Sequence, residues 1–151
     1  MTRYPVTYSP IREYWRTIES GKETANRKVY AFYRHLNAKL EGLVEPEFRY
    51  DPRRANHVLE FAENYCRHSK GKLGGQLVKL ELWEKAMLAA MFGFVDDEGN
   101  RQYRYVILIV GKKNGKSLLA SIVGNYMLAA DGEKGPEVYS VATKRDQAKI
   151  I

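Results

Sequence analysis

Cysteine, proline and long hydrophobic runs are all scarce in this sequence. Its 151 residues include one cysteine and five prolines. A single cysteine cannot form an internal disulfide, and the first residues contain no apolar run typical of a signal peptide, so we expect an intracellular protein. No apolar segment reaches the ~20 residues that a membrane-spanning helix needs, which excludes insertion into a membrane.

The charge of the chain is basic and unevenly distributed. Apolar residues make up 44% of the sequence and charged residues 28%, which is typical of a soluble globular protein and excludes disordered and fibrous classes. The net charge is +7, and the first 80 residues hold 15 basic and 9 acidic residues against 10 and 9 in the remainder. This surplus in the first half suits a polyanionic partner.

The first half of the sequence predicts helices. Apolar residues recur at helical spacing over 9–40, interrupted by a Ser-Gly pair at 20–21, so we expect a helical hairpin. Asp51 and Pro52 are typical of a helix start, and we predict a third helix over 53–68 with basic residues in its last turn.

The second half of the sequence alternates between helix and strand patterns. We predict a helix over 82–93, a turn at 96–100, a buried strand over 104–110, a helix over 117–130 and a second strand over 137–143. Strand, helix and strand in this order are typical of a βαβ unit with parallel strands.

These patterns predict an α/β protein with two regions. The glycine-rich stretch SKGKLGGQ separates a helical region over 1–72 from a region over 73–151. We expect the second region to contain a parallel sheet with flanking helices.

The segment VGKKNGKSLL at 110–119 carries the clearest chemical signal. It lies between a predicted strand and a predicted helix, where a phosphate-binding loop belongs. Gly111 and Gly115 allow close approach of the backbone to phosphate, Lys116 suits the β- and γ-phosphates, and Ser117 suits Mg²⁺. The first glycine stands one place later than in the pattern G-x-x-x-x-G-K-[ST]. The motif predicts that the second region is a partial P-loop NTPase, with a parallel sheet and flanking helices. A basic surface turn capped by Ser117 is the alternative interpretation.

These residues, with their neighbours, resemble the large terminase subunit of tailed bacteriophages. The resemblance rests on the run from Leu80 onward, LELWEKAMLAAMFGFVDDEGNRQYRYVILIVGKKNGKSLLASIVGNYMLAADGEKGPEVYSVATKRDQAKI, and upstream on SPIREYWRTIESGKE and ANHVLEFAENYCRHSKGKLGG. It implies an ATP- and Mg²⁺-dependent motor that threads double-stranded DNA into a procapsid. The implied partners are the phage portal, the small terminase subunit and further copies of the chain in a ring, all in the host cytoplasm.

The resemblance also implies roles for individual residues. Lys116 and Lys112 would be catalytic and Ser117 would hold Mg²⁺, with Trp83 and Glu84 at the adenine. The implied ATP-binding residues are Gly111, Lys112, Lys113, Asn114, Gly115, Lys116, Ser117, Trp83 and Glu84.

This sequence departs from the family's usual pattern at two of these positions. Lys112 stands where the family usually has arginine. A lysine keeps the positive charge but lacks the forked guanidinium group with which arginine can donate two parallel hydrogen bonds. Glu84 stands where the family usually has glutamine, and its carboxylate only accepts hydrogen bonds, which puts adenine selectivity in question.

Contacts with DNA are predicted less specifically. The positions of Lys144, Arg145 and Gln147, just after the second predicted strand, resemble those at which related translocating ATPases touch nucleic acid. A solvated helical surface is the alternative there. The same two interpretations apply to a basic group around the third predicted helix, which comprises Arg49, Arg53, Arg54, Arg67, Lys70 and Lys72.

The acidic residues that a P-loop ATPase needs are not evident in this sequence. Asp96 and Asp97 follow an apolar stretch but precede Gly99, so we interpret them as part of a turn rather than as metal ligands. In the family the acidic pair lies downstream of the second strand. We therefore expect a fragment that binds nucleotide weakly and does not hydrolyse it at the rate of a motor.

Two other classes of function remain open from the sequence. One is a different P-loop enzyme, such as a small-molecule kinase. The other is a non-catalytic DNA-binding module that uses GKKNGK as a basic loop. A metal site at Cys66, His57 and His68 is disfavoured, because their spacing is not a recognised ligand pattern.

Overall fold

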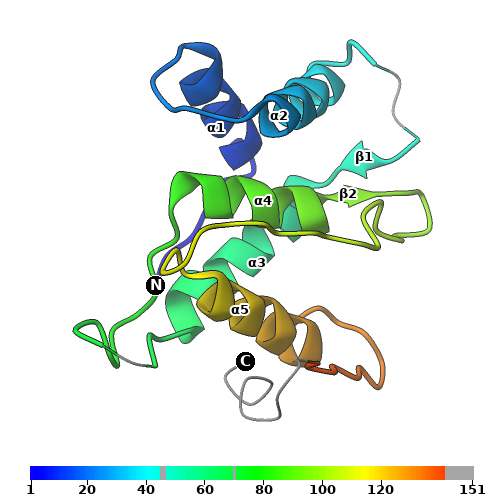
Figure 1. The fold of residues 1–151 in the computed structure, drawn as a ribbon. Helices are drawn as coiled ribbons and strands as arrows, with labels where there is room; N and C mark the ends of the chain where they lie inside the picture. The colour runs from blue at the N-terminus through cyan, green and yellow to red at the C-terminus, as the bar shows by residue number, and fades with distance from the viewer. Residues whose placement is uncertain (45–46, 70, 142–151) are drawn as a thin grey trace. The chain divides into compact units, whose positions relative to one another are not determined.

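The computed structural model describes residues 1–44, 47–69 and 71–141 (Figure 1). In these ranges the chain forms helices joined by loops and one small sheet. The elements in chain order are α1 (Pro10–Glu19), α2 (Arg27–Leu40), β1 (Arg49–Tyr50), α3 (Pro52–Tyr65), α4 (Leu82–Gly93), β2 (Phe94–Val95) and α5 (Lys116–Ala129).

The chain divides into two compact units. The first unit combines Met1–Glu60 with Leu80–Val106, and the second combines Phe61–Lys79 with Ile107–Ile151. Each unit therefore takes residues from both halves of the sequence. The domain boundary near residue 72 stays a prediction.

The predicted helical hairpin is confirmed as α1 and α2. The Ser9 hydroxyl accepts the backbone N–H of Arg12 at 3.4 Å, and Pro10 occupies the first helical position. Asn26 caps α2 by accepting two backbone N–H groups at 3.0 Å. Local capping chemistry therefore sets where both helices begin.

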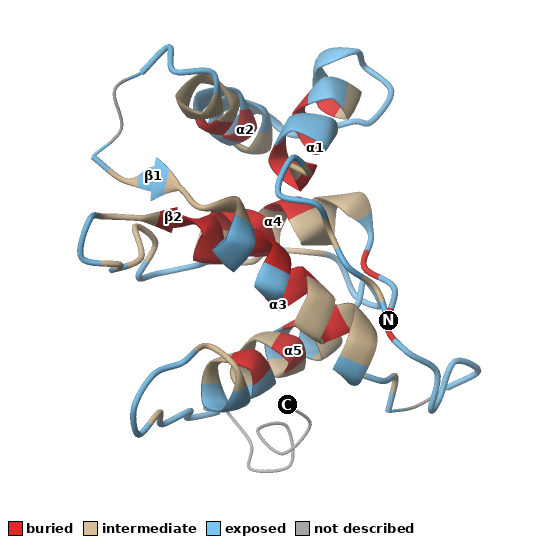
Figure 2. Ribbon diagram, turned by 180° about the vertical axis from the view of Figure 1, so that it is seen from behind, coloured by how far each residue is buried: buried red, intermediate tan, exposed pale blue. Residues whose placement is uncertain are grey.

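The core of the first unit lies where α4 packs on α1. The small side chains on the buried face of α4 allow a close approach, and aromatic rings from α1 and α2 fill the space around them. Tyr14 of α1 meets Tyr33 of α2 edge to face, with ring centroids 4.7 Å apart. Figure 2 shows the buried residues concentrated on α4 and β2. The buried cluster comprises Ile11, Tyr14, Trp15, Ile18, Tyr33, Leu36, Ala55, Ala86, Ala89, Ala90 and Phe94.

A short antiparallel sheet completes the first unit. β1 pairs with β2 so that Arg49 lies opposite Val95 and Tyr50 lies opposite Phe94. The sequence did not predict this pairing, because two-residue strands carry no periodic signal. The turn predicted at 96–100 is confirmed, since the Asp96 and Asn100 backbones hydrogen-bond to each other across it at 3.0 Å.

The third predicted helix is confirmed, but its end is not where we expected it. The carboxylate of Asp51 accepts the backbone N–H of Arg53 at 2.8 Å at its start, as predicted. However, α3 ends at Tyr65, so the prediction of a basic last turn is wrong. Arg67 instead lies in an antiparallel bridge with Leu77, because the glycine-rich stretch turns the chain back on itself.

The core of the second unit is built on α5, which confirms the helix predicted over 117–130. Its buried side chains are Leu119, Ile122 and Tyr126. The ring of Tyr126 packs edge to face on Phe61, with centroids 5.5 Å apart. No helix within the described ranges is both long and apolar enough to span a membrane.

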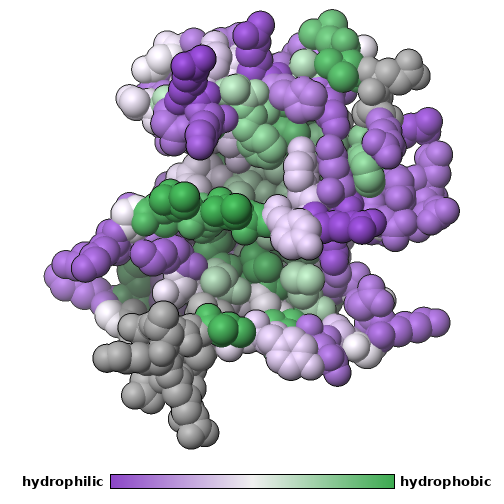
Figure 3. All heavy atoms as spheres, turned by 45° about the vertical axis from the view of Figure 1, so that its right-hand side comes forward, coloured by the Kyte–Doolittle hydropathy of each residue, from purple (hydrophilic) through white to green (hydrophobic). Residues whose placement is uncertain are grey.

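The two predicted strands are not formed by the described residues. Residues 104–110 are irregular, and Tyr105, Ile107 and Ile109 are 90%, 86% and 89% exposed. The described part of the second predicted strand, 137–141, is likewise irregular and exposed, whereas 142–143 lie outside the description. A strand requires a hydrogen-bonded neighbour, and neither segment finds one among the described residues. Figure 3 shows apolar residues, in green, on the surface of the protein beside hydrophilic ones.

Candidate nucleotide-binding site

The loop from Gly111 to Gly115 has a backbone suited to an anion. Gly115 precedes α5 in the left-handed conformation, with φ 68° and ψ 3°, and Lys113 also has a positive φ of 67°. A side chain at Gly115 would be strained in this conformation, so glycine is the fitting residue. Two left-handed positions in close succession curl the loop and carry the chain into the helix.

The first turn of α5 follows the loop directly. Lys116 and Ser117 are its first two residues, and the N-cap residue is Gly115, which has no side chain with which to cap the helix. The N–H groups of a first turn have no partner within their helix, and the helix dipole gives that end a partial positive charge. These are the properties of an anion-binding helix terminus.

All seven residues from Gly111 to Ser117 are exposed. A Cβ placed on Gly111 would lie 3.2 Å from the Nδ2 atom of Asn114, so the loop brings these two residues together and a larger residue at 111 would crowd it. The loop therefore presents backbone, lysine and hydroxyl groups to solvent while the helix behind it is held by its buried face.

The part of the chain that contains this loop matches a known protein family. The model of the family "Terminase large subunit, ATPase domain" matches residues 82–151. These residues are therefore similar to the ATPase domain of terminase large subunits. The matched segment contains α4, the loop and α5.

A curated relative covers more of the chain. The large terminase subunit of Enterobacteria phage HK97 is 29% identical over 99 residues, which is 65% of this chain and 19% of the relative. The chain thus spans about a fifth of the length of this terminase subunit. No solved structure shows a significant match.

Trp83 and Glu84 lie in the first turn of α4. They belong to the first compact unit, whereas the loop belongs to the second. Trp83 packs against the core of the first unit. The Glu84 carboxylate accepts the backbone N–H of Glu81 at 2.9 Å, in a capping box that starts the helix. Both residues therefore have a structural role in this unit, and their contact with adenine stays a prediction.

The acidic turn is organised around the carboxylate of Asp96. It accepts the backbone N–H of Glu98 at 3.0 Å and the backbone N–H of Asn100 at 2.8 Å. Hydrogen bonds from Asn100 are the main cause that lowers the pKa of Asp96. The side chain of Asp97 is 90% exposed and lies 3.9 Å from Arg49. The turn interpretation is confirmed for both aspartates.

Cys66 lies just past the end of α3 and is half-buried, and this burial raises the pKa of its thiol. Its carbonyl oxygen accepts the backbone N–H of Val78 at 3.0 Å. The described ranges contain no group of three or more histidine, cysteine, aspartate or glutamate side chains that could hold a metal ion.

Several members of the predicted basic group contact the chain itself. Arg54 donates to the carbonyl oxygen of Gly99 at 3.0 Å, and Arg67 donates to that of Gly75 at 2.6 Å. These contacts use the guanidinium groups to hold loops in place. Lys70 and the three predicted DNA contacts Lys144, Arg145 and Gln147 lie outside the described residues.

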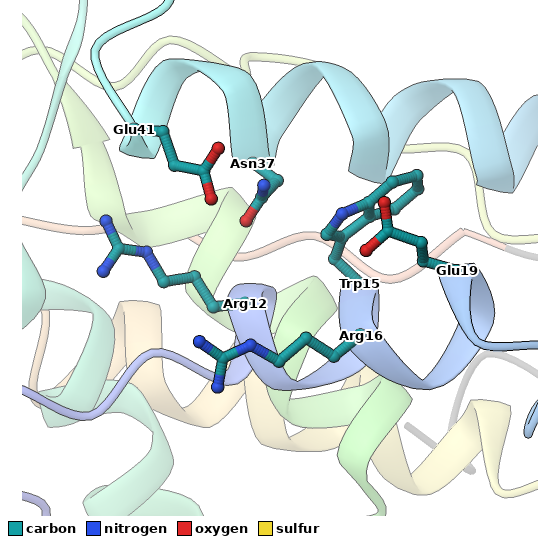
Figure 4. Close-up of a pocket in the computed structure, with 6 residues that line it drawn as sticks. All are labelled: Arg12, Trp15, Arg16, Glu19, Asn37 and Glu41. Atoms are coloured by element: carbon teal, nitrogen blue, oxygen red, sulfur yellow. The ribbon is translucent and has the colours of Figure 1, made fainter.

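A pocket that the sequence did not indicate lies between α1 and α2. It has a volume of about 260 Å³, and Figure 4 shows the side chains that line it, with Asn37 and Glu41 of the α2 side facing Arg12 and Arg16 of α1. The guanidinium of Arg12 donates to the carbonyl oxygen of Leu40 at 2.7 Å. Two arginines and two glutamates line the pocket, so its formal charge is balanced. The remaining lining residues are Trp15 and Glu19.

Proposed function

We propose that residues 111–117 bind the phosphates of ATP in a motor that moves DNA. The observation that carries this proposal is the left-handed Gly115 at the uncapped start of α5, inside the segment matched to an ATPase domain. A basic surface turn would not need this backbone. A phosphate cradle does, because the chain must curl around the anion and then enter a helix.

Each residue of the loop has a role in this proposal. Lys116 neutralises the β- and γ-phosphates, and Lys112 adds positive charge near the γ-phosphate as charge develops there. Gly111 lets the backbone approach the ligand. Lys113 and Asn114 contribute exposed polar groups at the rim of the loop.

The residues present suit Mg²⁺ as well as ATP. The Ser117 hydroxyl is exposed in the first turn of α5 and is the group that would hold the metal. Bound Mg²⁺ would neutralise phosphate charge when ATP is bound.

We also propose that Trp83 and Glu84 lie beside the adenine. Trp83 offers a ring face, and Glu84 offers a carboxylate that can accept a hydrogen bond from the adenine amino group. Because Glu84 cannot donate to a ring nitrogen, discrimination between ATP and GTP would be weaker than with a glutamine.

Residues 104–110 and 137–143 are, in this proposal, strands of a parallel sheet. The support is the apolar run over 105–110, the β-branched and aromatic residues within 137–143, and the high exposure of side chains such as Ile107 and Ile109. Parallel strands are usually buried on both faces, and burial of these side chains would stabilise the sheet.

The wider function follows from the terminase family. We propose that the complete motor hydrolyses ATP to translocate double-stranded DNA into a procapsid, acting with a portal and a small terminase subunit in the host cytoplasm. Copies of the chain would form a ring around the DNA. Lys144, Arg145 and Gln147 are proposed DNA contacts.

The test compares Lys116→Ala with Lys134→Ala, because both lysines are exposed and each substitution removes one positive charge. A hydrogen bond from a charged group contributes about 1.5–3 kcal/mol, so Lys116→Ala should weaken ATP binding about 10- to 150-fold. Lys134→Ala should leave ATP binding unchanged. Titration of each variant with a fluorescent ATP analogue gives the dissociation constants.

Affinity for DNA separates this proposal from a basic DNA-binding module. The ATPase proposal expects Lys116→Ala to retain its affinity for duplex DNA while it loses ATP binding. Loss of salt-sensitive DNA binding with no change in nucleotide binding would instead favour the module. Unchanged ATP affinity in Lys116→Ala would refute the assignment of the loop.

A further inference from the structure

The charge on α2 is entirely of one sign. Its 14 residues, Arg27–Leu40, contain four basic side chains and no acidic one. The preceding helix α1, by contrast, carries two glutamates beside its two arginines. The basic surplus of the first half of the chain is therefore concentrated on one helix.

Three of the four basic side chains share the solvent-facing side of α2. Arg27, Lys28 and Arg34 are exposed, whereas Tyr33 and Leu36 turn to the core. Arg27 and Arg34 are seven residues apart, which places them on the same side of the helix about 10 Å apart along its axis. We call Arg27, Lys28 and Arg34 the basic face of α2.

Within the part of the chain that the structure describes, no carboxylate forms an ion pair with the basic face. Across residues 1–44, 47–69 and 71–141, none of its three members takes part in an ion pair. The fourth basic residue, Lys39, differs, because its Nζ atom lies 3.3 Å from the side-chain oxygen of Gln102 and 5.6 Å from the ring centre of Phe94. The three residues of the basic face therefore leave their charges to solvent or to a ligand.

The position of these charges opposes helix stability. Arg27 and Lys28 occupy the first turn of α2, at the positive end of the helix dipole, where acidic residues are favoured. In α1 the order follows the dipole, with Glu13 in the first turn and Arg16 in the last. A local arrangement that costs stability without a structural benefit is typical of a functional site.

The aromatic residues of α2 are engaged within the unit. Tyr30 packs on Trp15 with ring centroids 5.0 Å apart, and Phe32 packs on Tyr33 at 5.3 Å. Two residues lie between Arg27 and Arg34 on this side of the helix: Tyr30, which is 40% exposed and packs on Trp15, and the small residue Ala31. Protein interfaces usually centre on an aromatic or apolar anchor, and because the aromatic ring of Tyr30 already packs within the unit, positive charge dominates the chemistry of the face, which favours a polyanion over a protein.

We propose that the basic face of α2 contacts the phosphate backbone of duplex DNA. The choice of duplex DNA as the polyanion rests on the proposed role in DNA packaging. Phosphates of one strand recur every 3.4 Å along the duplex axis, so a span of about 10 Å reaches across about three nucleotides. Contacts of this kind are independent of base sequence, as a protein that moves along DNA requires.

The test measures the affinity of the 151-residue chain for a 30-base-pair duplex by fluorescence anisotropy at several salt concentrations. Replacing Arg27→Ala together with Arg34→Ala removes two phosphate contacts. The slope of log affinity against log salt should become shallower by about 2, and the dissociation constant at 0.1 M salt should rise at least about tenfold. The effect should be the same for unrelated DNA sequences.

Two controls accompany the double variant. Arg3→Ala with Lys134→Ala removes the same charge from exposed positions elsewhere and should change the slope by less than 1. Arg27→Lys with Arg34→Lys keeps the charge and should retain the affinity, since phosphate contact needs charge more than the guanidinium fork. All variants should bind ATP as the parent chain does, so a failure of this inference is distinct from a failure of the nucleotide site.

The inference is overturned if the alanine double variant has the same affinity for DNA and the same salt dependence as the parent chain. That result would leave an acidic protein as the partner of the basic face. It is also overturned if the control pair loses as much affinity, since the effect would then be one of net charge alone.

Discussion

The replacement of Gly93 by alanine gives a direct test of the packing in the first unit. A Cβ on Gly93 would lie 2.6 Å from the Cε2 atom and 3.0 Å from the Cδ2 atom of Tyr50, and 3.0 Å from the Cβ of Ala55. Carbon atoms pack at about 3.5–4.0 Å, so all three contacts are too short. The Tyr50 ring is rigid and lies against Phe94 with centroids 5.2 Å apart, so it cannot simply rotate away.

The expected cost of this substitution is that of overpacking a core. Inserting a methyl group that forces such shifts typically costs 1–3 kcal/mol. For a chain of this length, about 2–4 °C of melting temperature corresponds to each kcal/mol, so Gly93→Ala should lower the melting temperature by about 2–12 °C. Thermal unfolding followed by circular dichroism measures the melting temperature of each variant.

Gly124→Ala is the matched control, because it makes the same chemical change inside a helix. A Cβ on Gly124 would lie 3.5 Å from the Cγ1 atom of Val138, which is an ordinary contact. Alanine is favoured over glycine in a helix interior by about 0.5–1 kcal/mol, so this variant should melt at a slightly higher temperature. Equal melting temperatures for Gly93→Ala and the parent chain would refute the packing of Tyr50 against α4.

Three further substitutions and titrations test local features. Gly115→Ala should lower the free energy of unfolding by about 1–2 kcal/mol, because it forces a side chain into the left-handed conformation, and it should also weaken ATP binding. A melting temperature equal to that of the parent chain would contradict the loop geometry. NMR titration of Asp96 should give a pKa below the ordinary 3.8. Because the folded state favours its carboxylate, the stability it contributes is present above the unfolded pKa and is lost as the pH falls through the folded pKa, and Asp96→Asn should abolish this pH dependence. The thiol of Cys66, whose pKa is raised by burial, should react with iodoacetamide several-fold more slowly at pH 8 than free cysteine does, and denaturant should remove the difference.

The elements that could be predicted from the sequence are those with local causes. The starts of α1 and α3 follow from Ser9 and Asp51, whose side chains accept N–H groups two or three residues ahead. The start of α5 follows from Gly115. Capping and glycine conformations depend on a few neighbouring residues, so they can be inferred without knowledge of the rest of the chain.

The features that sequence reasoning missed depend on distant residues. The pairing of β1 with β2 joins Tyr50 to Phe94, which are 44 positions apart, and nothing local signals it. The basic residue Arg67 was assigned to a helix end, yet its backbone pairs with Leu77 after a glycine-rich turn. The apolar stretch 104–110 has the composition of a strand, but a strand forms only where a partner supplies hydrogen bonds.

The same distinction between local and distant causes applies to the residues of the candidate site. The residues of the loop, from Gly111 to Ser117, could be named from their spacing, since a phosphate cradle is made by consecutive residues. The packing of Trp83 on the core of the first unit could not, because that core also contains residues far away in the sequence, such as Tyr14 and Tyr33.

The sequence by itself determined the helices, their caps, the candidate phosphate loop and the resemblance to terminases, since each of these rests on short-range patterns. Tertiary structure alone decided which basic side chains remain unpaired. Arg54 contacts the carbonyl oxygen of Gly99 and Arg67 contacts that of Gly75, whereas Arg27 and Arg34 form no ion pair with a carboxylate of the described residues. Charge is counted from composition, but whether it is neutralised depends on which groups the fold brings within a few ångströms.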